Sequence, residues 1–223
     1  MIAFIQDTGT TTGTTVANEA WAALDINAGQ RDLYTIQSDG TGLTKLNGQS
    51  LDFHSVDALP DGSRAVFAAN ATDGYSQIYY LAPVASTTKP VQLTITPGDK
   101  KDPMLSADGS KIIFVQYNPA TLRFDIAVMK SDGSNLYTTP TESDWNVQHP
   151  ALSPDGSKIV VEMWNANQGV HAIFIVNADG SNANRLTNLF RDEYPAFSPD
   201  GKQVVFSSAI AETFSQLIRM APA

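Results

Sequence analysis

The chain has 223 residues, of which 42% are hydrophobic and 17% are charged, and its formal net charge is −9. This composition is typical of a folded globular protein and excludes a mainly disordered chain. The acidic balance argues against nucleic-acid backbones and anionic membranes as main partners, because those bind clustered Lys and Arg. The absence of cysteine excludes disulfides, thiolate metal sites and cysteine nucleophiles.

In chain order, the first expected element is a strand at MIAFIQD (residues 1–7), with Phe4 in the second strand of an incomplete first unit. This stretch has no basic region or cleavage site of a secretion signal. A Thr/Gly-rich loop insertion is expected over residues 8–30, because such a composition favours a flexible connection. The one helix candidate, VANEAWAALDI at 16–26, lies within that insertion.

Two short segments recur along the chain at a fixed spacing. The segments ALPDGSRAVF, LSADGSKIIF, LSPDGSKIVV and FSPDGKQVVF place an Asp-Gly pair at intervals of 47, 47 and 45 residues. A second set, IQSDGTG, MKSDGSN and VNADGSN, places Asp39, Asp132 and Asp179 in the other half of the period. Repeats of this length are typical of solenoids and propellers.

Each period predicts four strands. An entry strand leads to the first Asp-Gly turn, two apolar strands such as KIVV and HAIFIV follow, and a short polar strand comes after the second turn. Asp-Gly pairs suit hairpin turns because they tolerate positive φ, and the central strands lack alternation, as do strands buried on both faces. The sequence therefore predicts one all-β domain over residues 1–223, a β-propeller of four-stranded antiparallel blades.

The pattern SPDGSKIVV…IFIVNADGSNANRLT resembles the TolB-like propeller repeat of bacterial extracytoplasmic proteins, and the match is most specific in residues 101–206. About five units are expected, with the first beginning at its second strand and the last ending after its third. TolB-like rings usually have six blades, so the chain would form part of a six-bladed ring or an open array. The resemblance implies an extracytoplasmic location (periplasmic, secreted or at the cell surface). Its relatives include the periplasmic Tol-system protein, oligogalacturonate-lyase-like enzymes and peptidase propellers.

The stretch HPALSPDGSKIVV at 149–161 contains the residue types of a Ser-His-Asp triad. However, Ser153 is replaced by Leu59 in one copy and Pro154 by Ala107 in another, whereas Asp-Gly persists in all four. A motif that recurs in every unit is explained by a turn that every unit needs, whereas a catalytic site would need only one copy. No catalytic residue is therefore predicted. The expected structural turn residues are Asp61, Gly62, Asp108, Gly109, Asp155, Gly156, Asp200 and Gly201.

Function is expected at the opposite rim, where the loops differ between copies. Residues just before each entry strand would face the central channel, and exposed aromatic residues suit protein or sugar contacts. Trp164 and Tyr117 are expected to pack between blades, and His171 to be structural or at the surface. The predicted binding residues are His54, Asp102, Trp145, Gln148, His149, Asp192, Glu193 and Trp21.

The favoured function is a non-enzymatic scaffold that binds a protein or glycan partner on this rim and needs no cofactor. One alternative is a polysaccharide lyase or glycosidase that uses the histidines and carboxylates at the channel mouth, with a divalent metal in the central channel. Another is a structural subunit that forms an oligomer, in which a second chain pairs with the open sheet edges. No nucleic-acid partner and no membrane span are expected.

Overall fold

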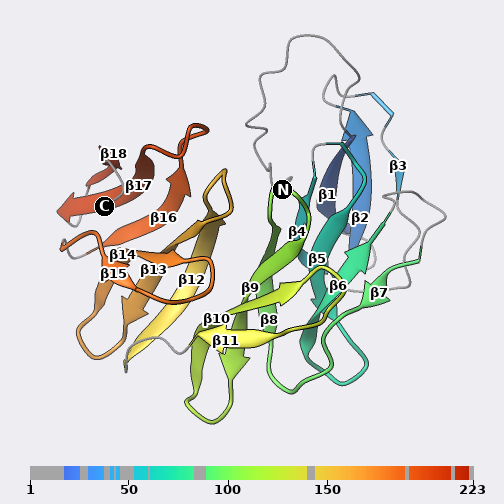
Figure 1. Ribbon diagram of the computed structural model, residues 1–223, viewed down its shortest axis with the longest axis horizontal. Helices are drawn as coiled ribbons and strands as arrows, with labels where there is room; N and C mark the ends of the chain where they lie inside the picture. The colour runs from blue at the N-terminus through green and yellow to red at the C-terminus, as the bar shows by residue number, and fades with distance from the viewer. Residues whose placement is uncertain are drawn as a thin grey trace. The chain divides into compact units, whose positions relative to one another are not determined.

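The computed structural model describes residues 18–25, 30–37, 41–42, 44–45, 53–59, 61–82, 89–139, 144–188, 191–211 and 214–220. Every regular element among them is a β-strand (Figure 1). The strand expected at residues 1–7 lies outside the described residues. The chain divides into two compact units, residues 1–112 with 131–133 and residues 113–130 with 134–223.

Three antiparallel sheets have four strands each, and consecutive strands are neighbours in every sheet. The first contains β4 (Phe53–Ala58), β5 (Ala65–Asn70), β6 (Ser76–Leu81) and β7 (Val91–Gln92). The next contains β8 (Lys100–Leu105), β9 (Lys111–Asn118), β10 (Arg123–Lys130) and β11 (Tyr137–Thr139). The third contains β12 (Trp145–Leu152), β13 (Lys158–Asn165), β14 (Val170–Asn177) and β15 (Asn184–Arg185).

Two further sheets have three described strands each. One contains β1 (Asn18–Asp25), β2 (Gln30–Gln37) and β3 (Thr44–Lys45), and the other contains β16 (Asp192–Phe197), β17 (Val204–Ala211) and β18 (Phe214–Met220). The predicted all-β fold of four-stranded antiparallel units is thereby confirmed.

The start of the chain corrects the sequence interpretation. Residues 18–25 form β1, which pairs in regular antiparallel register with β2, Trp21 lying opposite Tyr34. The second strands β1, β5, β9, β13 and β17 begin at residues 18, 65, 111, 158 and 204, so β1 keeps the repeat period. The helix expected at 16–26 is wrong, and the loop expected over 8–30 is wrong for the residues of β1. Pairing with β2 supplies ladder hydrogen bonds that outweigh the helix propensity of the alanines.

The four predicted Asp-Gly turns join the first and second strands of four of the five sheets. In the turn between β12 and β13, Gly156 has a φ of +69°, and its N–H donates to the carbonyl of Ser153 at 2.8 Å. The side chain of Asp155 accepts the Ser157 N–H at 3.0 Å and the Ser153 hydroxyl at 2.6 Å. The other three turns repeat the positive φ of glycine and the same backbone bond.

Each unit has its own apolar core. In the first unit, Phe67 stacks on Tyr79 with ring centroids 5.5 Å apart and packs against Phe53 at 5.0 Å. In the second unit, Val160 and Ile173 pack with Phe206 of β17. The β-branched and aromatic composition of the central strands suits burial on both faces. Among the described residues, no helix is long and apolar enough to cross a membrane.

Candidate functional site

A buried carboxylate lies at the centre of the second unit's polar residues. Glu162 belongs to β13, whose sequence KIVVEMWN is otherwise mostly apolar, and its side chain is only 1% exposed. A buried charge of this kind is costly unless hydrogen bonds surround it. Glu162 lies in register with Gln148 of β12 and Ile173 of β14, in the halves of these strands that are farther from the Asp-Gly turns.

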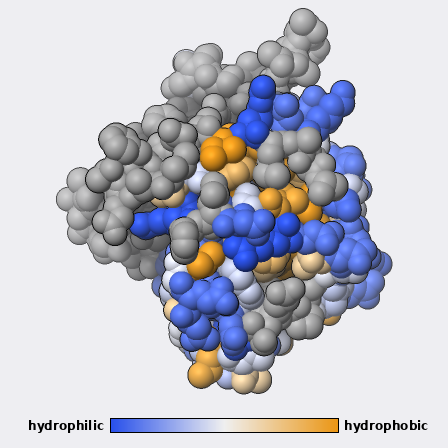
Figure 2. All heavy atoms as spheres, turned by 90° about the vertical axis from the view of Figure 1, so that its left-hand side faces the viewer, coloured by the Kyte–Doolittle hydropathy of each residue, from blue (hydrophilic) through white to orange (hydrophobic). Residues whose placement is uncertain are grey.

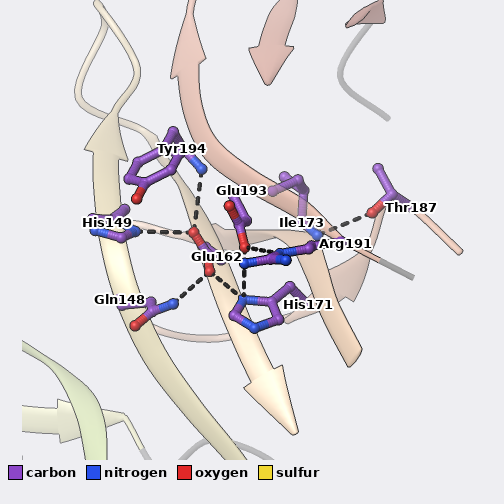
Figure 3. A network of polar contacts seen from close by, with 9 residues as sticks. All are labelled: Gln148, His149, Glu162, His171, Ile173, Thr187, Arg191, Glu193 and Tyr194. Atoms are coloured by element: carbon purple, nitrogen blue, oxygen red, sulfur yellow. Dashed lines mark hydrogen bonds and ion pairs between the residues drawn. The ribbon is translucent and has the colours of Figure 1, made fainter. Parts of the chain in front are cut away.

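Four donors converge on this carboxylate, as Figure 3 shows. Its Oε1 accepts hydrogen bonds from Gln148 Nε2 and from His171 Nδ1, the latter at 2.6 Å. Its Oε2 accepts hydrogen bonds from His149 Nδ1 at 2.9 Å and from the backbone N–H of Tyr194 at 3.2 Å. Because an ionised carboxylate only accepts, each imidazole must carry its proton on Nδ1.

Burial acts to raise the pKa of Glu162, but the hydrogen bonds from His149, His171, Gln148 and the Tyr194 backbone outweigh it and lower the pKa to about 2. The side chain is therefore an anion at neutral pH. The donors come from β12 and β14 of the same sheet and from β16 of the next, so the carboxylate ties the two sheets together.

A β-bulge makes this convergence possible. In a regular strand, consecutive side chains point to opposite faces, yet Gln148 and His149 both reach Glu162. The ladder between β12 and β13 shifts register between Gln148 and Ala151, and His149 has a φ of +47°. The bulge therefore turns His149 toward the same carboxylate as its neighbour.

The positive φ recurs at the same repeat position in other sheets. Asp102 in β8 and Tyr194 in β16 have φ values of +52° and +56°, and the β16 ladder also shifts register there. The N–H of each of these two residues bonds to a side chain of the preceding sheet, Ser55 Oγ for Asp102 and Glu162 Oε2 for Tyr194. A strained backbone conformation repeated in three sheets is a structural device of this fold.

A second layer of side chains lies outside the buried carboxylate. The imidazole of His149 packs on the ring of Tyr194, with centroids 4.4 Å apart, and the ring of Trp164 lies 6.0 Å from that of His171. The Arg191 guanidinium donates from Nε to Glu193 Oε1 at 2.9 Å. Tyr194 is 61% exposed and Trp164 is 37% exposed, and the Arg191 side chain is 66% exposed. We name these three residues, with His149 and Glu193, the rim patch.

Three of the predicted binding residues meet in this network. They are Gln148, His149 and Glu193, the last of which lies with its Oε1 3.7 Å from His171 Nδ1. No role was predicted for Glu162, and His171 was expected only to be structural or at the surface. The sequence nevertheless marks Glu162. In each repeat, the residue seven positions after the turn Asp lies in an apolar strand. That residue is Ala68, Val115 or Ser207 in three repeats and Glu162 in the fourth. A charge inside an apolar strand is the feature that identifies the site.

Three other predicted residues lie elsewhere than expected. Trp145, placed by the sequence in an exposed connection, is 7% exposed, with its ring edge-on to Phe174 at 5.2 Å and Arg185 Cζ 5.4 Å from its centroid. Asp192 is fully buried opposite Ser208 in the ladder, and within the described chain its carboxylate has no hydrogen-bond partner. Trp21 lies in the middle of β1 and not in a rim loop.

The remaining predicted residues belong to the first unit. His54 is exposed, and its Nε2 lies 2.8 Å from Asn70 Oδ1. Asp102 is half-buried at the positive-φ position of β8. In the second unit, Trp164 is exposed although packing between blades was expected, and Tyr117 contacts Phe124 with ring centroids 5.3 Å apart.

One group of side chains has the donor atoms of a metal site. Within the described chain, Glu162, His171 and Glu193 each offer one oxygen or nitrogen, and the three atoms lie within 4.8 Å of one another. This set differs from the channel-mouth set that the sequence suggested, because it includes neither His54 nor Asp102.

Separate sheets of three or four antiparallel strands in chain order are the units of which β-propellers are built. No protein-family model matches the chain, and no curated protein matches it by sequence. Solved structures do match. A TolB structure from Agrobacterium tumefaciens is 24% identical, with 85% of this chain and 70% of that chain covered and a TM-score of 0.68. The fold is therefore that of a TolB-like β-propeller.

Two further solved structures support the same fold. TolB from Acinetobacter baumannii is 22% identical, with 92% of this chain and 49% of that chain covered and a TM-score of 0.69. An oligogalacturonate lyase solved in complex with manganese is 14% identical, with 92% of this chain and 65% of that chain covered and a TM-score of 0.63. The chain thus spans about half the length of the Acinetobacter TolB chain.

Proposed function

We propose that the chain is a non-enzymatic propeller scaffold that acts outside the cytoplasm and binds a protein partner through the rim patch. The observation that carries this proposal is the combination of exposed Trp164, Arg191 and Tyr194 around a fully hydrogen-bonded buried carboxylate. Tryptophan, tyrosine and arginine are the residues most enriched at the energetic centres of protein interfaces.

The network supports binding because it holds the patch in place before a partner arrives. His149 is fixed by Glu162 and supports the ring of Tyr194, and Glu193 holds Arg191. Side chains that are already ordered lose less conformational entropy when they are covered. A patch held in this way gains affinity from the same contacts that stabilise the sheets.

The surface composition favours a few anchor residues over a broad apolar interface. The face drawn in Figure 2 is mostly hydrophilic among its described residues, with hydrophobic side chains exposed in small separate groups. Most transient interfaces are likewise polar overall and depend on a few aromatic and arginine contacts. In the first unit, His54 and Asp102 occupy the corresponding strand positions and remain proposed as further contacts.

The test is a comparison of captured proteins. Immobilised wild-type chain and a Trp164→Ala, Tyr194→Ala double variant are incubated with an extract of the source organism, and bound proteins are quantified by mass spectrometry. Tyr137→Ala serves as the control, because Tyr137 is 39% exposed on β11, beside the Asp-Gly turns. The proposal expects a protein that the wild type and the control enrich and the double variant does not.

Equal enrichment by all three chains would contradict the proposal. The same chains are also tested on a glycan array. Binding to the array without capture of any protein would identify a glycan as the partner. The location is tested by fractionating cells that express the native gene, and recovery only in the cytoplasmic fraction would contradict it.

An enzyme is the second candidate, favoured by the similarity to the oligogalacturonate lyase solved with manganese. His149 is held by an ionised carboxylate through Nδ1, which is the arrangement of a general base oriented by an acid residue. Incubation with oligouronates, followed by absorbance of the unsaturated product, tests this function. Product formation that Glu162→Gln abolishes would replace the scaffold proposal.

A further inference from the structure

Three strands bring three ligand atoms to one point in the second unit. Glu162 Oε1 comes from β13, His171 Nδ1 from β14 and Glu193 Oε1 from β16. The imidazole nitrogen lies 2.6 Å from the first oxygen and 3.7 Å from the second. Figure 3 shows both carboxylates directed toward the His171 ring.

Both carboxylates lie near Nδ1 of His171, but only one of them accepts its proton. The Nδ1–H of His171 bonds to Glu162, and at 3.7 Å the Glu193 oxygen is beyond hydrogen-bond range. Glu162 is 1% exposed and Glu193 is 21% exposed, so neither charge is fully screened by water. A divalent cation in place of that proton would interact with all three atoms at once and neutralise both carboxylates.

We propose that Glu162, His171 and Glu193 bind one divalent transition-metal ion, with two carboxylate oxygens and one imidazole nitrogen as ligands. The donor set selects the class of metal. Ca²⁺ and Mg²⁺ prefer all-oxygen sites, and Cu(I) prefers sulfur. Mixed oxygen and imidazole ligands suit Mn²⁺ and Zn²⁺, and three protein ligands leave further positions open to water or to a partner's side chain.

The rest of the network prepares the ligands. His149 Nδ1 and the Tyr194 N–H hold Oε2 of Glu162, which leaves Oε1 directed at His171. Such outer hydrogen bonds orient metal-ligating carboxylates. Gln148 shares Oε1 and would have to move or accept a longer contact.

One cation already competes for this position. Arg191 Nε lies 2.9 Å from the same Glu193 oxygen that would ligate the metal. The Arg191 side chain is 66% exposed, so it can swing into water when an ion binds. Removal of this competitor should therefore strengthen metal binding, which a merely structural role of the cluster would not predict.

The experiment uses the full chain, freed of metal with EDTA and dialysed, then titrated with Mn²⁺ while free Mn²⁺ is followed by electron paramagnetic resonance. The wild type is expected to bind one ion saturably. His171→Ala and Glu193→Gln should each weaken binding by about 10-fold or more. Arg191→Ala should tighten it by about threefold, the size of a surface ion-pair effect. His54→Ala is the matched control, a histidine of the other unit, and should leave binding unchanged.

Absence of saturable binding up to about 1 mM Mn²⁺, far above the usual range of transition-metal sites, would overturn the proposal. Unchanged affinity in both His171→Ala and Glu193→Gln would also overturn it, because the ion would then lie elsewhere. Glu193 is partly exposed, so Glu193→Gln is expected to fold, and circular dichroism verifies this for each variant. Because no partner is present in the titration, its result is independent of the proposed scaffold function.

Discussion

Replacement of Glu162 by Gln tests the centre of the network most severely. The amide keeps the shape of the side chain but removes its charge, and its NH₂ group faces two hydrogen-bond donors in either orientation. A pKa of about 2 in place of the ordinary 4.5 corresponds to roughly 3 kcal/mol of stability at neutral pH. We expect Glu162→Gln to lower the free energy of unfolding by about that amount.

The loss of stability in Glu162→Gln should depend on pH. Because the pKa of Glu162 is lowered in the folded chain, its stabilisation is complete above the ordinary value of 4.5 and is lost as the pH falls toward about 2. The difference between wild type and Glu162→Gln should therefore be constant from about pH 6 upward and shrink between about pH 5 and pH 3.

The assay is urea unfolding followed by circular dichroism, in EDTA so that both chains are metal-free. Glu193→Gln is the control, because its pairing with Arg191 is exposed to water and should contribute little to the stability. A loss below about 1 kcal/mol for Glu162→Gln at pH 7, or the same loss at pH 3, would refute the reasoning. Either result would mean that the four donors do not stabilise the ionised carboxylate.

The remaining predictions concern the backbone and the core. Gly109→Ala and Gly169→Ala both place a side chain at a φ of +65°, but only at Gly109 would the new Cβ lie 2.7 Å from Arg64 Nη1 and 2.9 Å from Leu59 Cδ1. Thermal unfolding should show that the free energy of unfolding falls by about 1 kcal/mol for Gly169→Ala and by roughly 2–3 kcal/mol for Gly109→Ala. Equal losses would contradict the close packing of Arg64 and Leu59 around Gly109. At the positive-φ position of β8, Asp102→Gly should leave the stability unchanged or raise it, whereas Asp102→Val should lower it by at least about 1 kcal/mol because β-branched residues avoid positive φ. Because Trp145 is buried, Trp145→Ala should lower the free energy of unfolding by about 3–5 kcal/mol. Removal of an exposed tryptophan would change it little, so a small loss would support the exposed position predicted from the sequence.

The repeats made the fold predictable. Asp-Gly pairs mark turns through the φ that glycine tolerates, and the apolar strands between them show burial on both faces. These local signals are enough to predict four-stranded antiparallel units, which the sheets confirm. They failed at residues 18–25, where no Asp-Gly turn precedes the strand and alanines imitate a helix.

The site could be predicted only in part, for physical reasons. His149 and Glu193 were found because they vary between copies at one rim. The bulge that turns His149 toward Glu162 depends on pairing between strands, which no local pattern reports. The burial of Trp145 depends likewise on Phe174, 29 residues further along the chain. Glu162 itself could have been found, as the single acidic residue in the KIVVEMWN strand.

The most direct test of the scaffold proposal is an affinity measurement with the captured protein, once it is purified. Isothermal titration compares wild type, Tyr194→Ala and the control Tyr137→Ala. The proposal predicts that Tyr194→Ala weakens binding by about 30-fold, the effect of an interface anchor worth roughly 2 kcal/mol, and that Tyr137→Ala leaves the Kd unchanged. An unchanged Kd for Tyr194→Ala would contradict the placement of the partner on the rim patch.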